Sequence, residues 1–282
     1  MLATALIVFR EVLEAALVVG IVLAASQGVP RRGLWVAGGV GTGIAGSLLV
    51  AAFAEEIANA LSGIGQELFD AAVLFTAVAM LGWHNIWMGR HGRELAVEAS
   101  DVGKLVRAGA RPLHVLAIAV GLAVLREGSE LVLFLYGVVA ANGTTLAQSS
   151  AGFVLGFLAG AAVGALLYFG LLRIPLRHLF TVTSWLILLL AAGMAAQGAA
   201  FLMQADLLPA LGDTVWDTSR FLPDTSLLGQ MLHALIGYVA QPAGIQVVFY
   251  VATITLMGTL MWLVGRAGPT RTARPPRARP AE

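Results

Sequence analysis

The segment FREVLEAALVVGIVLA, residues 9–24, combines an apolar run that suits a membrane with three ionisable side chains. A second segment, VLREGSELVLFLYG at residues 124–137, repeats the same Arg-Glu-x-x-Glu spacing. The ionisable residues of the two motifs are Arg10, Glu11, Glu14, Arg126, Glu127 and Glu130. Residues three or four apart share one face of an α-helix, so both carboxylates of a motif can point to one side, with the guanidinium within reach of the second.

The composition is that of a polytopic membrane protein. Of the 282 residues, 59% are hydrophobic and 12% are charged, with a mean hydropathy of +0.85, whereas soluble domains carry about 25% charged residues. The absence of cysteine excludes disulfides, zinc–thiolate sites and iron–sulfur clusters. Nothing suggests nucleic-acid binding. The first segment lacks the basic start and uncharged core of a cleaved signal peptide, so we expect it to be a retained helix in the lipid bilayer.

Apolar runs of about 20 residues predict seven membrane-spanning helices in an all-α fold. They cover residues 2–25, 34–54, 67–88, 113–140, 149–172, 180–205 and 243–265. Fourteen Lys and Arg residues fall in one set of alternate connections, namely 26–33, 89–112, 173–179 and the tail 266–282, against Arg220 alone in the other set. Basic connections remain in the cytoplasm, which places the N-terminus outside and the C-terminus inside. The Pro- and Arg-rich tail is expected to be disordered.

The two motifs also indicate an internal duplication. Helices one to three, residues 2–88, would match helices four to six, residues 113–205, followed by an outer loop at 206–242 and helix seven at 243–265. The second helix of each unit is rich in small residues: GGVGTGIAG at 38–46, and Gly152, Gly156, Gly160 and Gly164 at every fourth position. Small residues let helix backbones approach closely. Because each unit has three spans, the copies have opposite orientations, which is a transporter architecture.

A rise of 1.5 Å per residue places both motifs near the middle of the bilayer. A charge at that depth costs about 2.5–3.5 kcal/mol even on insertion scales. Structural pairing explains one arginine and one glutamate in each helix but leaves the second glutamate unexplained. With all six groups ionised the net charge is −2, so a dry site would take up protons or bind a cation. We therefore predict a metal site of Glu11, Glu14, Glu127 and Glu130, with Arg10 and Arg126 as charge partners.

Two further groups are weaker candidates. Glu67 and Asp70 stand three residues apart at the outer start of helix three and could receive a cation before it enters; they also suit the positive end of a helix dipole. His84 in the same helix could ligate a soft metal. We instead interpret it as a hydrogen-bonded packing residue, because the neighbouring Trp83 and Trp87 indicate an interfacial belt.

At these residues the chain resembles the oxidase-dependent, high-affinity iron permeases, also called the iron/lead transporter family. The hallmark of that family is an Arg-Glu-Gly-Leu-Glu-type motif in helices one and four, which read REVLE at 10–14 and REGSE at 126–130 here. Val12 stands where the family usually has glycine, which could alter helix packing. The loop VWDTSRFLPDTSLLGQMLHALIGYVAQP, residues 215–242, is also similar.

The resemblance implies seven helices, iron import across the plasma (inner) membrane and the motif glutamates as iron ligands. It implies an extracytoplasmic ferroxidase or iron-delivery protein as partner, and no tightly bound cofactor besides the transported ion. The residues leave Fe²⁺ and Fe³⁺ open, as well as lead, manganese or another divalent cation. An embedded di-iron enzyme would need Glu-x-x-His pairs, which the chain lacks. A proton-coupled carrier of organic cations is a further alternative, although no aromatic cage accompanies the motifs.

Overall fold

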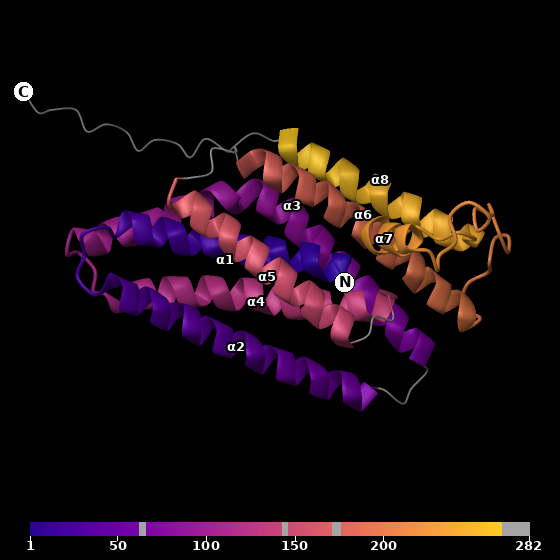
Figure 1. The fold of residues 1–282 in the computed structure, drawn as a ribbon, viewed down its shortest axis with the longest axis horizontal. Helices are drawn as coiled ribbons and strands as arrows, with labels where there is room; N and C mark the ends of the chain where they lie inside the picture. The colour runs from indigo at the N-terminus through magenta and orange to yellow at the C-terminus, as the bar shows by residue number, and fades with distance from the viewer. Residues whose placement is uncertain (62–65, 143–145, 171–175, 267–282) are drawn as a thin grey trace, which may run out of the picture.

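A computed structural model describes residues 1–61, 66–142, 146–170 and 176–266. Within these residues all regular structure is helical, in long rods that run side by side (Figure 1). The helices are α1 (Leu2–Ala25), α2 (Arg32–Leu61), α3 (Gln66–Arg107), α4 (His114–Asn142), α5 (Leu146–Tyr168), α6 (Leu176–Gln204), α7 (Leu227–Ile236) and α8 (Gly244–Arg266).

The long helices have the character of membrane spans. Five stretches in the described part of the chain are long and apolar enough to cross a bilayer: Arg32–Ala54, Glu67–Trp87, Ala147–Tyr168, His178–Gln204 and Gly244–Val264. Helices α1 and α4 are also long, but each contains one arginine and two glutamates in its apolar run. Apolar side chains such as Leu48 and Leu256 face outward on α2 and α8. The fold is therefore that of an all-α polytopic membrane protein.

Helices α1, α3 and α4 contact one another and form the centre of the bundle. Helix α5 packs along α1, and α2 packs along α4 at one edge of the molecule (Figure 1). Helix α6 packs on α3, and α8 covers α6 and part of α3 at the opposite edge. Both motif helices are consequently shielded from several sides, which allows their charged side chains to face protein.

The small-residue helices make the predicted close approaches. A Cβ atom on Gly43 of α2 would lie 2.8 Å from the carbonyl oxygen of Gly121 in α4. On the other side of the bundle, a Cβ on Gly156 of α5 would lie 2.5 Å from the carbonyl oxygen of Ala5 in α1. Real side chains do not tolerate such distances from backbone, so glycine is required where these helices meet.

Helix α3 is much longer than the sequence suggested. Residues 89–107, placed above in a cytoplasmic connection, continue the helix without a break, so the predicted end of this helix at residue 88 was wrong. The 42 residues of α3 span about 63 Å, about twice the hydrocarbon thickness. The extension is held by a second apolar cluster in which Ala99 and Val106 of α3 pack with Val22 of α1 and Leu116 of α4.

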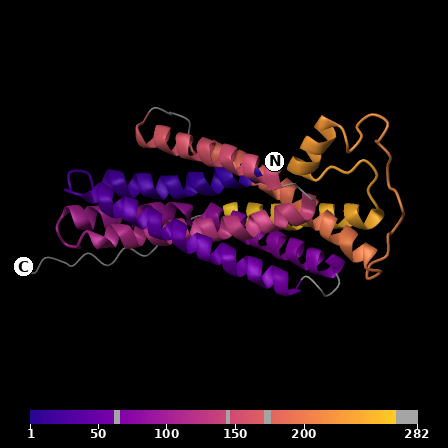
Figure 2. The same cartoon turned by 60° about the horizontal axis from the view of Figure 1, so that its bottom comes forward.

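The loop between α6 and α8, residues 206–242, is folded and contains the short helix α7. The Ser226 side chain caps α7 by accepting a hydrogen bond from the Gly229 amide, 2.9 Å away. At the other end, Gly237 adopts a left-handed conformation and lies against Gly193 of α6. Figure 2 shows the loop projecting beyond α6 and α8 at one end of the bundle.

Two aspartates stabilise this loop through hydrogen bonds. Asp224 Oδ1 accepts a hydrogen bond from the Ala240 amide at 2.9 Å. Asp217 Oδ1 accepts from the Ser219 hydroxyl at 2.6 Å and from the Ser219 amide at 2.9 Å, and these hydrogen bonds lower the pKa of the exposed Asp217. Both carboxylates therefore have structural partners within the loop. The predicted basic tail, apart from Arg266, lies outside the described residues.

Candidate metal centre

The first motif lies deep inside the protein. Arg10, Glu11 and Glu14 are each no more than 2% exposed. Arg10 Nε donates a hydrogen bond to Glu14 Oε1 at 2.8 Å, the i,i+4 pairing expected from the sequence. Removing such charges from water is costly unless they are paired, and one arginine cannot pair fully with two glutamates.

The second motif repeats this pairing at a more open position. Arg126 Nε donates to Glu130 Oε1 at 3.0 Å and lies 3.9 Å from Glu127 Oε1. The Arg126 side chain is 34% exposed, and its guanidinium carbon lies 4.2 Å from the ring centre of Trp87. Cation–π contacts of this kind hold a guanidinium in place without a second carboxylate.

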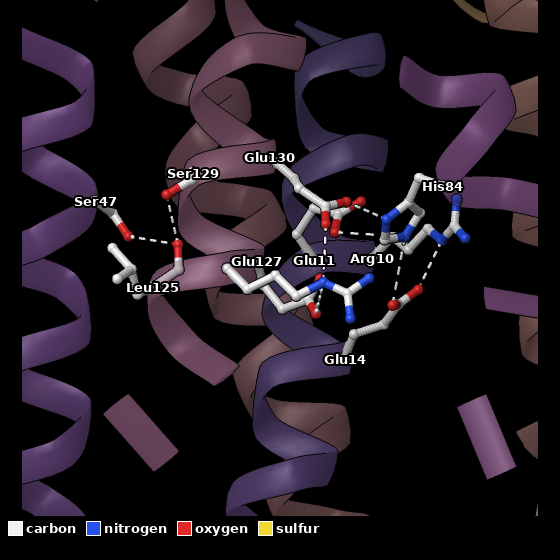
Figure 3. Close-up of polar contacts among 10 residues, drawn as sticks. Arg10, Glu11, Glu14, Ser47, His84, Leu125, Glu127, Ser129 and Glu130 are labelled. Atoms are coloured by element: carbon white, nitrogen blue, oxygen red, sulfur yellow. Dashed lines mark hydrogen bonds and ion pairs between the residues drawn. The ribbon is translucent and has the colours of Figure 1, made fainter. Parts of the chain in front are cut away.

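The structure brings the two motifs together around His84 of α3 (Figure 3). Ring atom Nε2 of His84 lies 3.5 Å from Glu14 Oε2 and 3.9 Å from Glu11 Oε2, while Nδ1 is in close contact with Glu130 Oε2. Glu11, His84, Glu127 and Glu130 each offer a ligand atom, and these four atoms lie within 4.8 Å of one another. Three helices thus converge on one point that is large enough for a single ion.

The polar atoms at this point are poorly satisfied by the protein itself. Among the described residues, the following buried atoms make no hydrogen bond of acceptable geometry: Arg10 Nη1, Glu11 Oε1 and Oε2, Glu14 Oε2, both ring nitrogens of His84, Glu127 Oε2 and Glu130 Oε2. Buried carboxylates normally have hydrogen-bond partners, and several unpaired ones around one point are unusual. A cation bound between them would satisfy the oxygens together, which is the chemistry of a carboxylate metal site.

Packing around the motifs fixes their helices. The Leu125 carbonyl, one residue before the second motif, accepts from Ser129 Oγ at 2.6 Å and from Ser47 Oγ of α2 at 3.4 Å (Figure 3). On α3, Asn85 donates to the Ser184 carbonyl of α6 at 3.0 Å. These bonds hold α4 and α3 at defined rotations, with their motif and histidine side chains directed at the site.

The departure of the first motif from the family pattern has a local explanation. Val12 faces Gly160 of α5, where a Cβ would lie 3.0 Å from the Val12 Cβ. In the second motif the glycine is on the motif helix and the larger residue is on its neighbour, because Gly128 faces Ser47. A Cβ on this glycine would lie 2.8 Å from the Ser47 Cβ. At this pair of equivalent positions each interface therefore has one glycine and one larger residue, and Val12 is accommodated with the Arg10–Glu14 pair in place.

A cavity of about 850 Å³ opens onto the site between α3 and α4. Its lining residues are Phe75, Thr76, Ala79, Met80, Trp83, His84, Trp87, Arg126 and Glu130. Arg126 and Glu130 of the second motif border this space, and no residue of the first motif does. The candidate site is thus enclosed on the α1 side and approachable on the α4 side.

The weaker sequence candidates have different outcomes. Glu67 is exposed and Asp70 is partly exposed, and the 14 residues from Asp70 to His84 correspond to about 21 Å along α3. They are not brought to the site. His84, interpreted above as a packing residue, is instead central and 2% exposed. Its role at the site could not be predicted from sequence spacing, because the partners of His84 lie on other helices and share no short spacing with it.

Comparison with known proteins agrees with the motif-based resemblance. Residues 1–269 match the Iron permease FTR1 family. The chain is 32% identical over 274 residues to the "Ferrous iron permease EfeU" of Escherichia coli strain CFT073, covering 94% of this chain and 96% of that protein. It is 31% identical over 250 residues to the protein of the same name from Yersinia pestis, covering 87% of each. No solved structure gives a significant match. The chain belongs to the iron permease FTR1 family.

Proposed function

We propose that this protein imports iron across the plasma membrane by binding it in a cage formed by Glu11, Glu14, Glu127 and Glu130. The observation that carries the proposal is that ligand atoms of Glu11 from the first motif and of Glu127 and Glu130 from the second lie within 4.8 Å of one another, with unpaired carboxylate oxygens. Glu14 lies beside this group, with its Oε2 3.5 Å from His84 Nε2. Family membership and the names of the relatives supply the substrate, iron. Transport rather than catalysis is the activity, because the relatives are permeases.

Charge balance supports a divalent ion in the cage. Four carboxylates and two guanidiniums carry a net charge of −2 when ionised, so Fe²⁺ brings the sum to zero and Fe³⁺ leaves +1. A neutral cluster avoids the high cost of an uncompensated charge in a medium of low polarity. Arg10 and Arg126 keep the empty carboxylates paired, and Arg126, which borders the cavity, can release Glu130 to the ion when it arrives.

Seven spans with the N-terminus outside remain our proposal for the topology. The five apolar spans surround α1 and α4, which are long enough to cross and turn their charges inward. The asymmetry of basic residues sets the orientation. The short α7 belongs to the outer loop between α6 and α8.

Matched contacts support an inverted repeat of α1–α3 and α4–α6. They are Gly43 with Gly121 and Gly156 with Ala5, then, four residues further on, Ser47 with Leu125 and Gly160 with Phe9. One constant difference in residue number relates α1 to α4, and a second constant difference relates α2 to α5. The α2–α4 and α5–α1 interfaces are therefore equivalent. Rocking of one repeat against the other would open the site alternately to the two sides.

Uptake of radioactive iron in a host that lacks its own importers tests the proposal. Glu14→Gln and Glu130→Gln should each abolish uptake at matched membrane expression, because each removes a charged ligand from the cage. Glu98→Gln, in the exposed part of the α3 extension, is the matched control and should transport normally. Competition by Pb²⁺ and Mn²⁺ ranks the other cations. Undiminished uptake in both motif variants would reject the cage.

An extracytoplasmic ferroxidase or iron-delivery protein completes the proposal as the partner that supplies the metal. The folded outer loop, with α7 and its structural acids, is the part of the chain exposed on that side. The same uptake assay with and without the extracytoplasmic fraction of the native host tests for such a supply. Full uptake without that fraction would show that the permease accepts free iron.

A further inference from the structure

The one nitrogen donor among the residues that the structure places at the site is His84. Resting on the function proposed above, we propose that His84 is a direct ligand of the iron and that it makes the cage select Fe²⁺ over Mg²⁺ and Ca²⁺. The imidazole stands between the two motifs and contacts glutamates from both α1 and α4. It is therefore placed to bind the ion that the glutamates share.

A packing role does not account for the surroundings of this histidine. A structural histidine in a protein interior normally has its ring nitrogens hydrogen-bonded. Both nitrogens of His84 are buried, and neither makes a hydrogen bond of acceptable geometry within the described part of the chain. Their neighbours are carboxylate oxygens of Glu14, Glu11 and Glu130, which are also incompletely satisfied.

The ring is oriented by groups that take no part in metal binding. The ring of Phe134 meets it edge to face, with centroids 6.1 Å apart. The next residue, Asn85, is anchored to the Ser184 carbonyl on α6, and Gly82 packs against Met257 of α8. The position of the imidazole is therefore set by α3 and its neighbours, and a rigid ligand is better preorganised than a mobile one.

The repeat supports a special role for this side chain. The offset that relates Leu68-Phe69 to Leu179-Phe180 also relates Gly82 to Gly193 and His84 to Ala195. Ala195 is buried in the core of the molecule. The equivalent position of α6 thus packs with a methyl group alone, so the helix packing of the repeat does not require a histidine. The four glutamates are related in pairs by the repeat, whereas the nitrogen donor His84 has no counterpart in the second repeat.

The donor set has consequences for selectivity. Carboxylates alone suit Mg²⁺, Ca²⁺ and Mn²⁺, whereas imidazole favours iron and later transition metals. Adding one neutral nitrogen donor improves binding of Fe²⁺ while offering little to Mg²⁺ or Ca²⁺. It does so without changing the charge balance that four carboxylates and two guanidiniums set.

Metal binding by the purified full-length protein in nanodiscs tests this role. His84→Gln should weaken Fe²⁺ binding under anaerobic conditions at least about tenfold, the lower end of the loss seen for disturbed metal ligands. Mg²⁺ and Ca²⁺ binding should change less than about threefold, because neither ion gains from nitrogen. His114→Gln, a substitution of the exposed histidine at the start of α4, is the matched control and should bind Fe²⁺ as the wild type does.

A second readout uses the unchanged protein. Pulsed electron paramagnetic resonance of Mn²⁺ bound to the wild type should show nitrogen modulation from a directly bound imidazole. That result stands even if His84→Gln fails to fold. Absence of nitrogen modulation, or a His84→Gln protein with wild-type affinity and selectivity, would overturn the inference.

The glutamate variants separate this inference from the proposed function. If Glu14→Gln and Glu130→Gln lose Fe²⁺ while His84→Gln retains it with unchanged selectivity, the cage stands and the role of His84 is wrong. If all three variants bind Fe²⁺ as the wild type does, both are wrong. Loss of Fe²⁺ in all three, with Mg²⁺ binding spared in His84→Gln alone, is the result we expect.

Discussion

The two Arg-Glu-x-x-Glu motifs have the same spacing and the same internal ion pair, yet their surroundings differ. The Arg10–Glu14 pair is closed to solvent, with side chains 2% and 1% exposed, whereas the Arg126–Glu130 pair has side chains 34% and 18% exposed. Helix α5 covers the first motif through its glycines, and a cavity borders the second. The same Arg-Glu-x-x-Glu spacing therefore produces one fixed half of the site and one half with room to move.

The difference has a consequence for transport. Arg126 can leave Glu130 by moving into the cavity, where the Trp87 ring already supports its guanidinium. Arg10 has no such space and remains on Glu14 unless the helices themselves move. We expect the first motif to hold the site together and the second to control exchange of the ion.

The largest expected effect is on stability, and it should separate the two arginines. Arg10→Ala leaves the buried Glu14 without its partner, which typically destabilises a protein by about 3–5 kcal/mol. Arg126→Ala should destabilise much less, since Glu130 borders the cavity and keeps its contact with His84. Thermal unfolding in detergent micelles measures both. Equal losses of stability in the two variants would contradict the difference between a fixed first motif and a more mobile second motif.

The next effect concerns the glycines of the two interfaces. Gly128→Val should destabilise by about 1–3 kcal/mol, because the added side chain meets Ser47 in a filled interface. Ser47→Gly in the same chain should restore stability, since the pair then reproduces Val12 facing Gly160. Thermal unfolding of the single and double variants gives the coupling. Additive losses in the double variant would contradict the equivalence of the two interfaces.

A smaller effect is expected at Trp87. Trp87→Leu removes the cation–π contact with Arg126, worth about 0.5–2 kcal/mol. Arg126 should then stay closer to Glu130, so the rate of iron uptake should fall more than the affinity for iron. Initial rates over a range of iron concentrations separate the two quantities. An unchanged rate with weakened affinity would assign Trp87 to binding instead of exchange.

The smallest effect is expected for the outer acids. Glu67→Gln with Asp70→Asn should raise the apparent KM for iron by only about two- to fivefold at low salt, because distant exposed charges act by attracting the ion. The effect should disappear at high ionic strength, where such fields are screened. Uptake at two salt concentrations provides the measurement. A loss that persists at high salt would indicate direct ligation.

The sequence predicted the elements of the fold more fully than the site. The all-α character, the Arg10–Glu14 and Arg126–Glu130 pairs and the close glycine packing depend on local spacing, and the structure contains them. The extension of α3 was missed, because its charged residues resemble a loop while Ala99 and Val106 pack on other helices.

His84 and the contrast between the motifs depend on tertiary arrangement. The histidine lies on a third helix at no telling distance in sequence from either motif. The exposure of Arg126 follows from which helices flank α4, and the shared spacing of the two motifs does not indicate that difference. Sequence periodicity predicts which residues share a helix face, but it does not predict which other helices pack against that face.

The central claim is that the two motifs share a single ion. The direct measurement is the number of Fe²⁺ ions bound per chain by purified protein under anaerobic conditions, for the wild type, Glu14→Gln and Glu130→Gln. A shared cage predicts that each wild-type chain binds one Fe²⁺ ion. At the Fe²⁺ concentration that saturates the wild type, neither variant should retain the ion. Two ions in the wild type, with one retained in each variant, would show that each motif binds its own metal and would contradict the shared site.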